Sequence, residues 1–224
     1  MGRQLRLGLS RALRSGRADF VVSAANAEAV RQLDAWPQWP GGALALVGPA
    51  GSGKSHLAAV WTERAGALPP DTAAPLAPVV FEDVDRAPAD EALFHLLNSA
   101  AERGGVLLTA RTRPSAWPTA LPDLRSRLNA LSVAELSEPD DAVLSGVLAR
   151  LFAQRSIRPP EDLIPYLLRR IERSVPKARD VVERLDEEAA ALHRPVTRAL
   201  AREVLEASGD LFTEETPGAD PAHD

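Results

Sequence analysis

The sequence contains no cysteine, which excludes disulfide bonds and thiolate metal sites. Its four histidines are scattered, without the spacing of metal ligands. No apolar run approaches the roughly 20 residues that cross a bilayer, and no continuous apolar segment follows the N-terminal arginines as it would in a secretory signal. We therefore expect a cytoplasmic protein without a membrane partner.

Positive charge and lysine are also scarce. The formal net charge is −5, which argues against a dedicated DNA-binding surface because such surfaces are usually basic. Of the 26 basic residues only Lys54 and Lys177 are lysines. Where arginine has replaced lysine so widely, a lysine that remains is a candidate for a specific role.

What the sequence does contain is an alternation of strand and helix patterns. Short apolar runs predict strands at 43–47, 79–81, 106–110 and 131–136. Helical patterns predict helices at 27–33, 54–64, 88–104 and 121–129. The stretch between the second of these helices and the second strand is short, so we expect an edge strand there to be reduced or lost. The alternation predicts an α/β fold with a parallel sheet covered on both faces.

The pattern becomes all-helical after residue 136. Ser137, followed three residues later by Asp140, predicts the capped start of a helix that runs to about residue 154. Further helices are expected at 160–172, 176–192 and 197–208. We therefore divide the chain into an N-terminal segment, a nucleotide-binding core, a helical unit and an acidic disordered tail, with boundaries at 1–20, 21–136, 137–210 and 211–224.

The segment GPAGSGKS, residues 48–55, fits the phosphate-loop pattern G-x-x-x-x-G-K-[ST] and stands between a predicted strand and a predicted helix. Its backbone N–H groups can converge on phosphate oxygens, Lys54 can reach the β- and γ-phosphates, and the Ser55 hydroxyl can bind Mg²⁺. The alternative is a plain glycine-rich turn. The predicted contacts to ADP or ATP are Gly48, Pro49, Ala50, Gly51, Ser52, Gly53, Lys54, Ser55 and His56.

The segment VVFEDVD, residues 79–85, ends the second predicted strand in acidic residues. Carboxylates at the carboxyl end of a strand beside a phosphate loop can hold Mg²⁺ and polarise a water molecule. We predict that Glu82 and Asp83 bind the metal together with Ser55, and that Asp83 is catalytic. The alternative is a solvated acidic turn.

The order of these motifs, followed by a helical unit, resembles the AAA+ ATPases, in which a P-loop core carries a small helical lid. The resemblance implies three further site residues. Thr109 would be a sensor 1 residue, Arg127 an arginine finger acting in trans, and Arg179 a sensor 2 arginine that reaches the nucleotide from the lid. The alternatives are an ordinary strand-end threonine and surface ion pairs, of Arg127 with Asp123 and of Arg179 with Glu183.

Within this superfamily the chain is similar to DnaA-related proteins of the Hda type over about residues 4–208. The resemblance implies that QLRLGL, residues 4–9, docks on the β sliding clamp, which is the DNA polymerase III beta subunit. Alternate side chains of an extended peptide can enter one groove. The docking residues would be Gln4, Leu5, Leu7 and Leu9. The alternatives are a strand paired with the protein's own sheet and pairing with a second copy, which would give a homodimer.

Together these resemblances imply a negative regulator of replication initiation. It would bind adenine nucleotide and the clamp and stimulate hydrolysis of the ATP held by DnaA, while its own hydrolysis would be weak. Its contact with DNA would be indirect, through the clamp. Two other functions stay open. One is an initiator-like ATPase that assembles on DNA, which the lack of a basic DNA-binding domain after residue 208 disfavours. The other is a stand-alone P-loop enzyme such as a small-molecule kinase.

Overall fold

The computed structural model describes residues 16–17, 20–72, 76–86 and 90–208. The predicted clamp motif at 4–9 and the predicted tail at 211–224 lie outside these residues. The strands are β1 (Ala43–Val47), β2 (Val79–Phe81), β3 (Val106–Ala110) and β4 (Ser132–Glu135). The helices are α1 (Ala27–Asp34), α2 (Lys54–Ala65), α3 (Asp90–Asn98), α4 (Pro122–Ala130), α5 (Asp141–Gln154), α6 (Leu163–Leu168), α7 (Val175–Leu192) and α8 (Arg198–Ala207).

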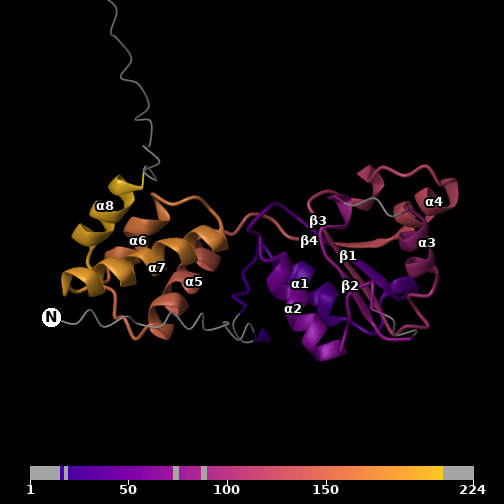
Figure 1. Cartoon of the computed structure of the whole chain (residues 1–224), viewed down its shortest axis with the longest axis horizontal. Coiled ribbons are helices and arrows are strands. Elements are labelled where there is room, and N and C mark those ends of the chain that lie inside the picture. The colour runs from indigo at the N-terminus through magenta and orange to yellow at the C-terminus, as the bar shows by residue number, and fades with distance from the viewer. Residues whose placement is uncertain (1–15, 18–19, 73–75, 87–89, 209–224) are drawn as a thin grey trace, which may run out of the picture.

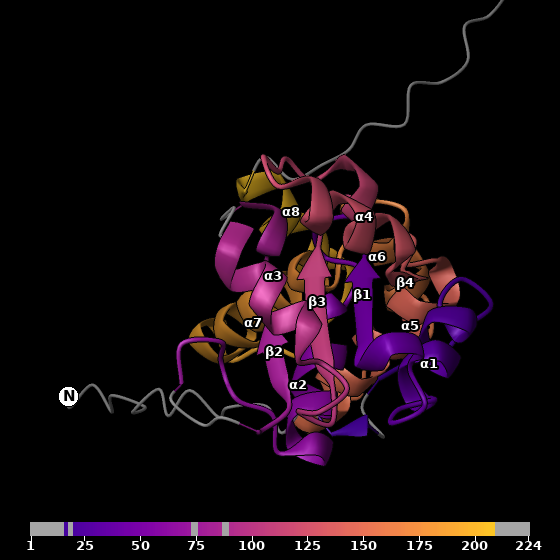
Figure 2. The ribbon, with the colours of Figure 1, turned by 90° about the vertical axis from the view of Figure 1, so that its right-hand side faces the viewer.

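The four strands form one parallel sheet in the order β2-β3-β1-β4. The central strand β1 pairs with β3 on one side and β4 on the other, so that Leu46 stands opposite both Thr109 and Ala134. Figure 2 shows β1 and β3 side by side and pointing the same way. The expected α/β fold with a parallel sheet is therefore confirmed.

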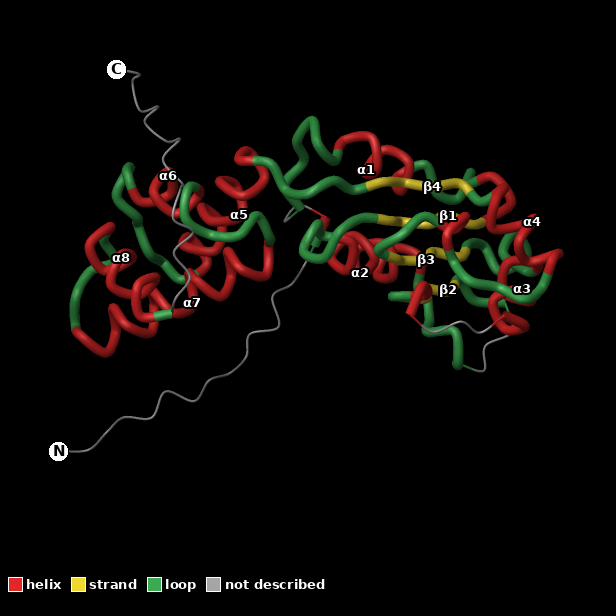
Figure 3. Tube along the Cα trace, turned by 90° about the horizontal axis from the view of Figure 1, so that it is seen from above, coloured by secondary structure: helices red, strands yellow, loops and turns green. Residues whose placement is uncertain are grey.

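Both faces of the central strands β1 and β3 are buried, which explains why these strands read as continuous apolar runs. Side chains alternate between the faces. Leu44 and Leu46 of β1 pack with α1 and α2, whereas Ala43 and Ala45 of the same strand pack with α3 and α4. Figures 1 and 3 show these helices as two layers with the sheet between them.

The outer edge of the sheet beyond β2 is nearly bare in the described residues. A single parallel bridge joins Leu68 to Val79 there. The Leu68 N–H donates to the carbonyl of Pro78 at 2.9 Å, and the Val80 N–H donates to the carbonyl of Leu68 at 3.0 Å. The expected reduction of an edge strand is confirmed for this part of the chain.

Helices α5 to α8 gather at one end of the molecule, on the side of the sheet that α1 and α2 cover (Figures 1 and 3). They enclose an apolar core of their own, which includes Leu148, Phe152, Tyr166, Val182 and Leu205. This core explains the apolar spacing of the C-terminal sequence, since each helix buries one stripe against the others. Within the described ranges, no helix combines the length and apolar character that a membrane crossing requires.

Three helices, α3, α5 and α6, have bounds that differ from the expectation by several residues. The helix predicted from Ser137 begins at Asp141, because the carboxylate of Asp140 accepts the Val143 N–H at 2.8 Å and is the actual N-cap. Helix α6 begins at Leu163, later than the 160–172 prediction, and ends earlier, at Leu168. Helix α3 ends at Asn98 rather than near Gly104, because turns fill the interval.

We expect Phe152→Ala to lower the free energy of unfolding of the helical unit by about 3–5 kcal/mol, because the side chain is fully buried among α5, α6 and α7. Chemical denaturation followed by circular dichroism measures this loss. The control is Leu192→Ala, since Leu192 is 47% exposed and its truncation should cost under about 1 kcal/mol. Equal losses in the two variants would contradict the assignment of this core.

Candidate nucleotide-binding site

The loop 48–55 leaves the sheet at the carboxyl end of β1. It is anchored on both sides: the Gly48 N–H donates to the carbonyl of Ala110, and the Leu136 N–H donates to the carbonyl of Val47, at 3.2 and 2.8 Å. Because all strands are parallel, the residues that follow β1, β2 and β3 meet at this edge. Open parallel sheets bind their ligands at such an edge.

Glycine is required in this loop for steric reasons. Gly51 and Gly53 have φ angles of +76° and +102°, a region that side chains disfavour. A Cβ atom on Gly48 would lie 2.3 Å from the carbonyl oxygen of Leu136. The backbone can therefore turn tightly at the end of β1 and enter α2 at Lys54.

Lys54 is the central charge of the loop. Its side chain is only 8% exposed, and its ammonium group donates to the carbonyl oxygens of Gly48 and Pro49, both at 2.7 Å. Burial lowers the pKa of Lys54 below its ordinary value, and the nearby Arg111 lowers it further, while Asp83 opposes both. A buried cation that shares its protons with neutral carbonyls is well placed to receive an anion.

The residues of the loop fit a phosphate-bearing ligand. The hydroxyl of Ser52 is buried and has no hydrogen-bond partner among the described residues, which is costly for a polar group unless a ligand engages it. The N-terminus of the 12-residue helix α2 begins at Lys54 and favours negative charge. The predicted phosphate contacts from 48 to 55 are thus brought together, although their binding remains a prediction.

The acidic residues after β2 lie at the same edge. Glu82 and Asp83 are both exposed. Asp83 has a left-handed φ of +51°, its N–H donates to the hydroxyl of the buried Thr109 at 3.1 Å, and its carboxylate lies 3.6 Å from Arg86. This contact joins the ends of β2 and β3 and places Thr109 beside the predicted metal ligands.

A complete metal cage is absent from the described residues, in which no group of three or more His, Asp or Glu side chains could hold an ion. Mg²⁺ is commonly held by one or two carboxylates together with phosphates of the substrate. The predicted ligands Ser55, Glu82 and Asp83 fit a site of that kind, in which the nucleotide supplies the remaining oxygens. The metal assignment stays a prediction.

Arg127 lies on the last turn of α4, on the face of the sheet opposite to α2. Its guanidinium stands over the ring of Phe94 of α3, 5.4 Å from the ring centroid. The suggested pairing with Asp123 is not formed, and within the described ranges Arg127 has no carboxylate partner. The structure therefore does not bring Arg127 to the chain's own loop.

Arg179 is exposed on α7. A hollow of about 370 Å³ is lined by Ala50 and Gly51 of the loop and by the start of this helix, where its lining residues include Lys177 and Asp180. Lys177 lies 3.7 Å from Asp180. The helix that carries Arg179 is thus next to the loop, but the contact of Arg179 itself with nucleotide remains a prediction.

Sequence reasoning missed the segment at residues 20–23, which lies against the loop. The ring of Phe20 packs edge-on to that of His56, with centroids 5.4 Å apart, and would touch a Cβ atom placed on Gly53. Val21 fits against Gly146 of α5, and the Ser23 hydroxyl donates to Asp140 at 2.8 Å. The apolar run FVV at 20–22 was the available signal.

Asp140 connects this segment to α5. The hydrogen bonds that its carboxylate accepts lower the pKa of Asp140. The bond from the Val143 N–H is the largest cause, and the bond from the Ser23 hydroxyl is the second. Because the folded pKa is depressed, the stabilisation is present at neutral pH and is lost as the pH falls through that value. We expect Asp140→Ala to cost about 1 kcal/mol at pH 7 and progressively less below about pH 4.

Urea unfolding at several pH values measures this effect. Asp140→Asn is the matched control, since asparagine caps helices about as well as aspartate but does not titrate. A cost of Asp140→Ala that stays constant from pH 7 to pH 2 would contradict the role assigned to the carboxylate.

Comparison with known proteins identifies relatives of this arrangement. No protein-family model matches the sequence. The chromosomal replication initiator protein DnaA of Thermomicrobium roseum is 29% identical over 119 residues, a stretch that makes up 51% of this chain and 25% of that DnaA. This chain is homologous to DnaA. It spans only about a quarter of the length of the curated DnaA that it matches, so the similarity concerns one part of that protein.

The solved structures agree on the fold. Domain III of DnaA from Thermotoga maritima superposes with a TM-score of 0.67 at 15% identity, covering 89% of this chain and 98% of that domain. RuvB of the same organism superposes with a TM-score of 0.67 at 16% identity, covering 86% of this chain and 72% of the RuvB chain. A DnaA bound to AMPPCP and single-stranded DNA superposes with a TM-score of 0.63 at 14% identity, covering 79% of this chain and 67% of that DnaA chain. The chain therefore has the fold that DnaA domain III and RuvB share.

Proposed function

We propose that this DnaA homologue is an Hda-type negative regulator of replication initiation, acting in the cytoplasm. It binds ADP or ATP with Mg²⁺ at the loop 48–55, docks on the β sliding clamp through Gln4, Leu5, Leu7 and Leu9, and stimulates hydrolysis of the ATP that DnaA holds. The homology to DnaA supports a role in the initiation system but does not choose between a regulator and an initiator.

The observation that carries the proposal is the environment of Arg127. The guanidinium is exposed, lacks a carboxylate partner in the described residues, and lies on the opposite layer of the core from the loop that begins α2. A cation so placed is available to a nucleotide on another molecule. Supplied in trans, it stabilises the charge that develops on the transferring phosphoryl group.

The second part of the proposal is that helices α5–α8 serve as a lid. The Val175 N–H at the start of α7 donates to the carbonyl of Gly51 at 3.3 Å, and Ser174 packs against the same glycine. Contact between the loop and α7 supports a lid whose position depends on the nucleotide. Arg179 on this helix is the proposed sensor 2 residue.

The test is single-turnover hydrolysis of ATP pre-bound to DnaA, in the presence of clamp loaded on DNA, with and without this protein. We expect acceleration by the wild type and its loss in a variant without residues 1–9. Separate binding measurements confirm that clamp and nucleotide are bound.

No acceleration by a wild-type protein that binds both ligands would overturn the regulator function. Nucleotide-dependent assembly on DNA in the same preparation would then favour the initiator-like ATPase. ATP consumption with a small-molecule acceptor, without DnaA, would favour a stand-alone enzyme.

A further inference from the structure

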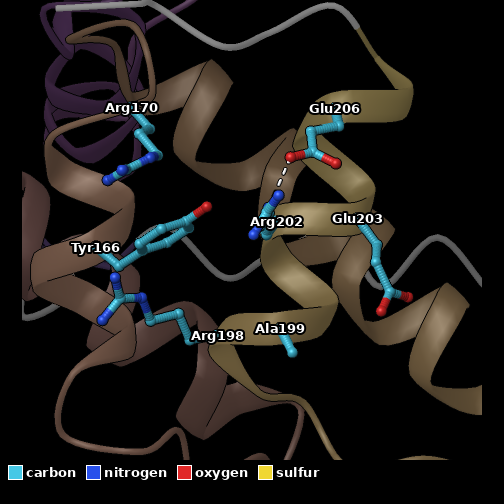
Figure 4. A pocket seen from close by; sticks show the side chains of 7 residues that line it. All are labelled: Tyr166, Arg170, Arg198, Ala199, Arg202, Glu203 and Glu206. Atoms are coloured by element: carbon cyan, nitrogen blue, oxygen red, sulfur yellow. Dashed lines mark hydrogen bonds and ion pairs between the residues drawn. The ribbon is translucent and has the colours of Figure 1, made fainter.

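A hollow of about 750 Å³ lies between α6 and α8, within the helical unit. Figure 4 shows it, and Figure 1 places both helices at the end of the molecule remote from α3 and α4. The side chains that line it include Tyr166, Arg170, Arg198, Arg202 and Glu206. Ligand sites commonly have volumes of roughly 300–1,000 Å³ and a few convergent polar groups, so the dimensions suit a small molecule or part of a polymer.

Two guanidinium groups are held against one aromatic ring in this hollow. The guanidinium carbons of Arg170 and Arg198 lie 4.1 and 4.9 Å from the centroid of the Tyr166 ring. In Figure 4 they stand on either side of the ring, and the tyrosine hydroxyl points toward Arg202. The ring itself is buried in the core of the unit. Stacking on a fixed ring restrains both arginines, so little side-chain freedom remains to be lost when a ligand binds.

The positive charges of the hollow are incompletely neutralised. Arg202 donates to Glu206 at 2.7 Å, and Arg198 lies 3.6 Å from Asp162. A further carboxylate that lines the hollow, Glu203, lies 3.4 Å from Arg194, which is outside the lining. Arg170 forms no ion pair with a carboxylate of the described residues. Of the three guanidinium groups that line the hollow, two are paired with a carboxylate. The N–H groups of Arg170 can therefore donate to a ligand.

We propose that this hollow binds the phosphate of a nucleotide, carried either by a free nucleotide or by a single nucleic-acid strand. Planar guanidinium groups match phosphate oxygens in paired hydrogen bonds, which a lysine does not do. Guanidinium planes stacked on an aromatic ring also offer a flat surface for a base. The hollow is separate from the loop 48–55, and the proposal does not depend on the regulator function.

The carboxylate of Glu206 limits the affinity, because it competes with the ligand for Arg202. Removing it should therefore strengthen binding, whereas removing Arg170 should weaken it. Opposite effects of two neighbouring charge changes are a stronger test than a loss alone, since damage to the fold would weaken binding in both variants.

The experiment uses Tyr166, the sole tyrosine of the chain, as a reporter. The full chain labelled with 3-fluorotyrosine gives one ¹⁹F resonance, which arises in the hollow. It is titrated at low salt with ten-nucleotide oligo(dT) in one arm and with ADP in the other. A Lys54→Met background keeps the ADP signal independent of the loop 48–55. We expect a saturable shift with at least one probe, weakened by added salt.

The variants then assign the shift to the hollow. Arg170→Gln should weaken binding about tenfold, and Glu206→Gln should tighten it several-fold. Arg169→Gln is the matched control, because this adjacent arginine is exposed and does not line the hollow, and its effect should stay within about twofold.

A shift with oligo(dT) alone would identify a nucleic-acid strand as the source of the phosphate, and a shift with ADP would identify a free nucleotide. No saturable shift with either probe would overturn the proposal. Equal losses in Arg169→Gln and Arg170→Gln would do the same, as would a shift with an oligoglutamate peptide but with neither phosphate probe.

Discussion

Replacing Arg127 by alanine is expected to reduce stimulated hydrolysis of DnaA-bound ATP by about 10³-fold or more, the effect of removing an arginine finger supplied in trans. The fold should be unaffected, because the side chain is exposed and its contact in the described residues is with the ring of Phe94. Single-turnover hydrolysis with clamp loaded on DNA measures the rate. Arg31→Ala, at an exposed arginine of α1, is the control.

The same assay tests how Arg127 is presented. Phe94→Leu keeps an apolar side chain on α3 but removes the ring under the guanidinium, so we expect a loss of about two- to fivefold. Phe94→Tyr should preserve the rate. If Arg127→Ala stimulates hydrolysis as well as the wild type, the arginine finger is another residue. If Arg127→Ala loses stimulation but Phe94→Leu keeps the wild-type rate, Arg127 acts without help from the ring.

Replacing Lys54 by methionine is expected to weaken nucleotide binding about 100-fold or more, because a buried ammonium that meets phosphate through charge-assisted hydrogen bonds is lost. Without nucleotide the same variant should be at least as stable as the wild type. Burial lowers the pKa of Lys54, which means that the folded protein disfavours the charge, and methionine relieves that cost while filling a similar volume.

Thermal unfolding with and without ADP measures both effects. The melting temperature of the wild type should rise with ADP concentration, since a ligand that binds only the folded state stabilises it. The melting temperature of Lys54→Met without ADP should equal or exceed that of the wild type, and it should not change as ADP is added. Lys177→Met provides the matched control at the other lysine. A large fall in stability of Lys54→Met without ligand would show that the ammonium stabilises the loop.

The central strands could be read from the sequence because they are buried on both faces of the sheet. The run at 43–47 is apolar throughout and became β1 with the same bounds, and 79–81 and 106–110 likewise became β2 and β3. The tight turn at 48–55 was equally readable, because its glycines stand where φ is positive or where a Cβ atom would clash. Asp140 was harder, because Ser137 and Asp140 both suit an N-cap and only the path of the chain decides between them.

The contacts that complete the site lie beyond local patterns. Ser23 and Asp140 are 117 residues apart, and nothing in either neighbourhood indicates that they meet. The contact of Phe94 with Arg127 is a similar case. Each residue fits the pattern of its own helix, and the two side chains meet only because α3 packs on α4. Sequence reasoning therefore located the loop 48–55 and its conformation, while the contacts around the loop required the structure.

The approach of Ser174 to Gly51 has a thermodynamic consequence. A Cβ atom on Gly51 would lie 2.6 Å from the Cβ of Ser174, so at this glycine the loop is in direct contact with the residue that caps α7. Any ligand that moves this glycine changes the free energy of docking α7, and reciprocity makes the coupling equal in both directions. A partner protein that changes the position of α5–α8 on the loop would change the affinity for nucleotide by the same factor by which nucleotide changes the affinity for the partner.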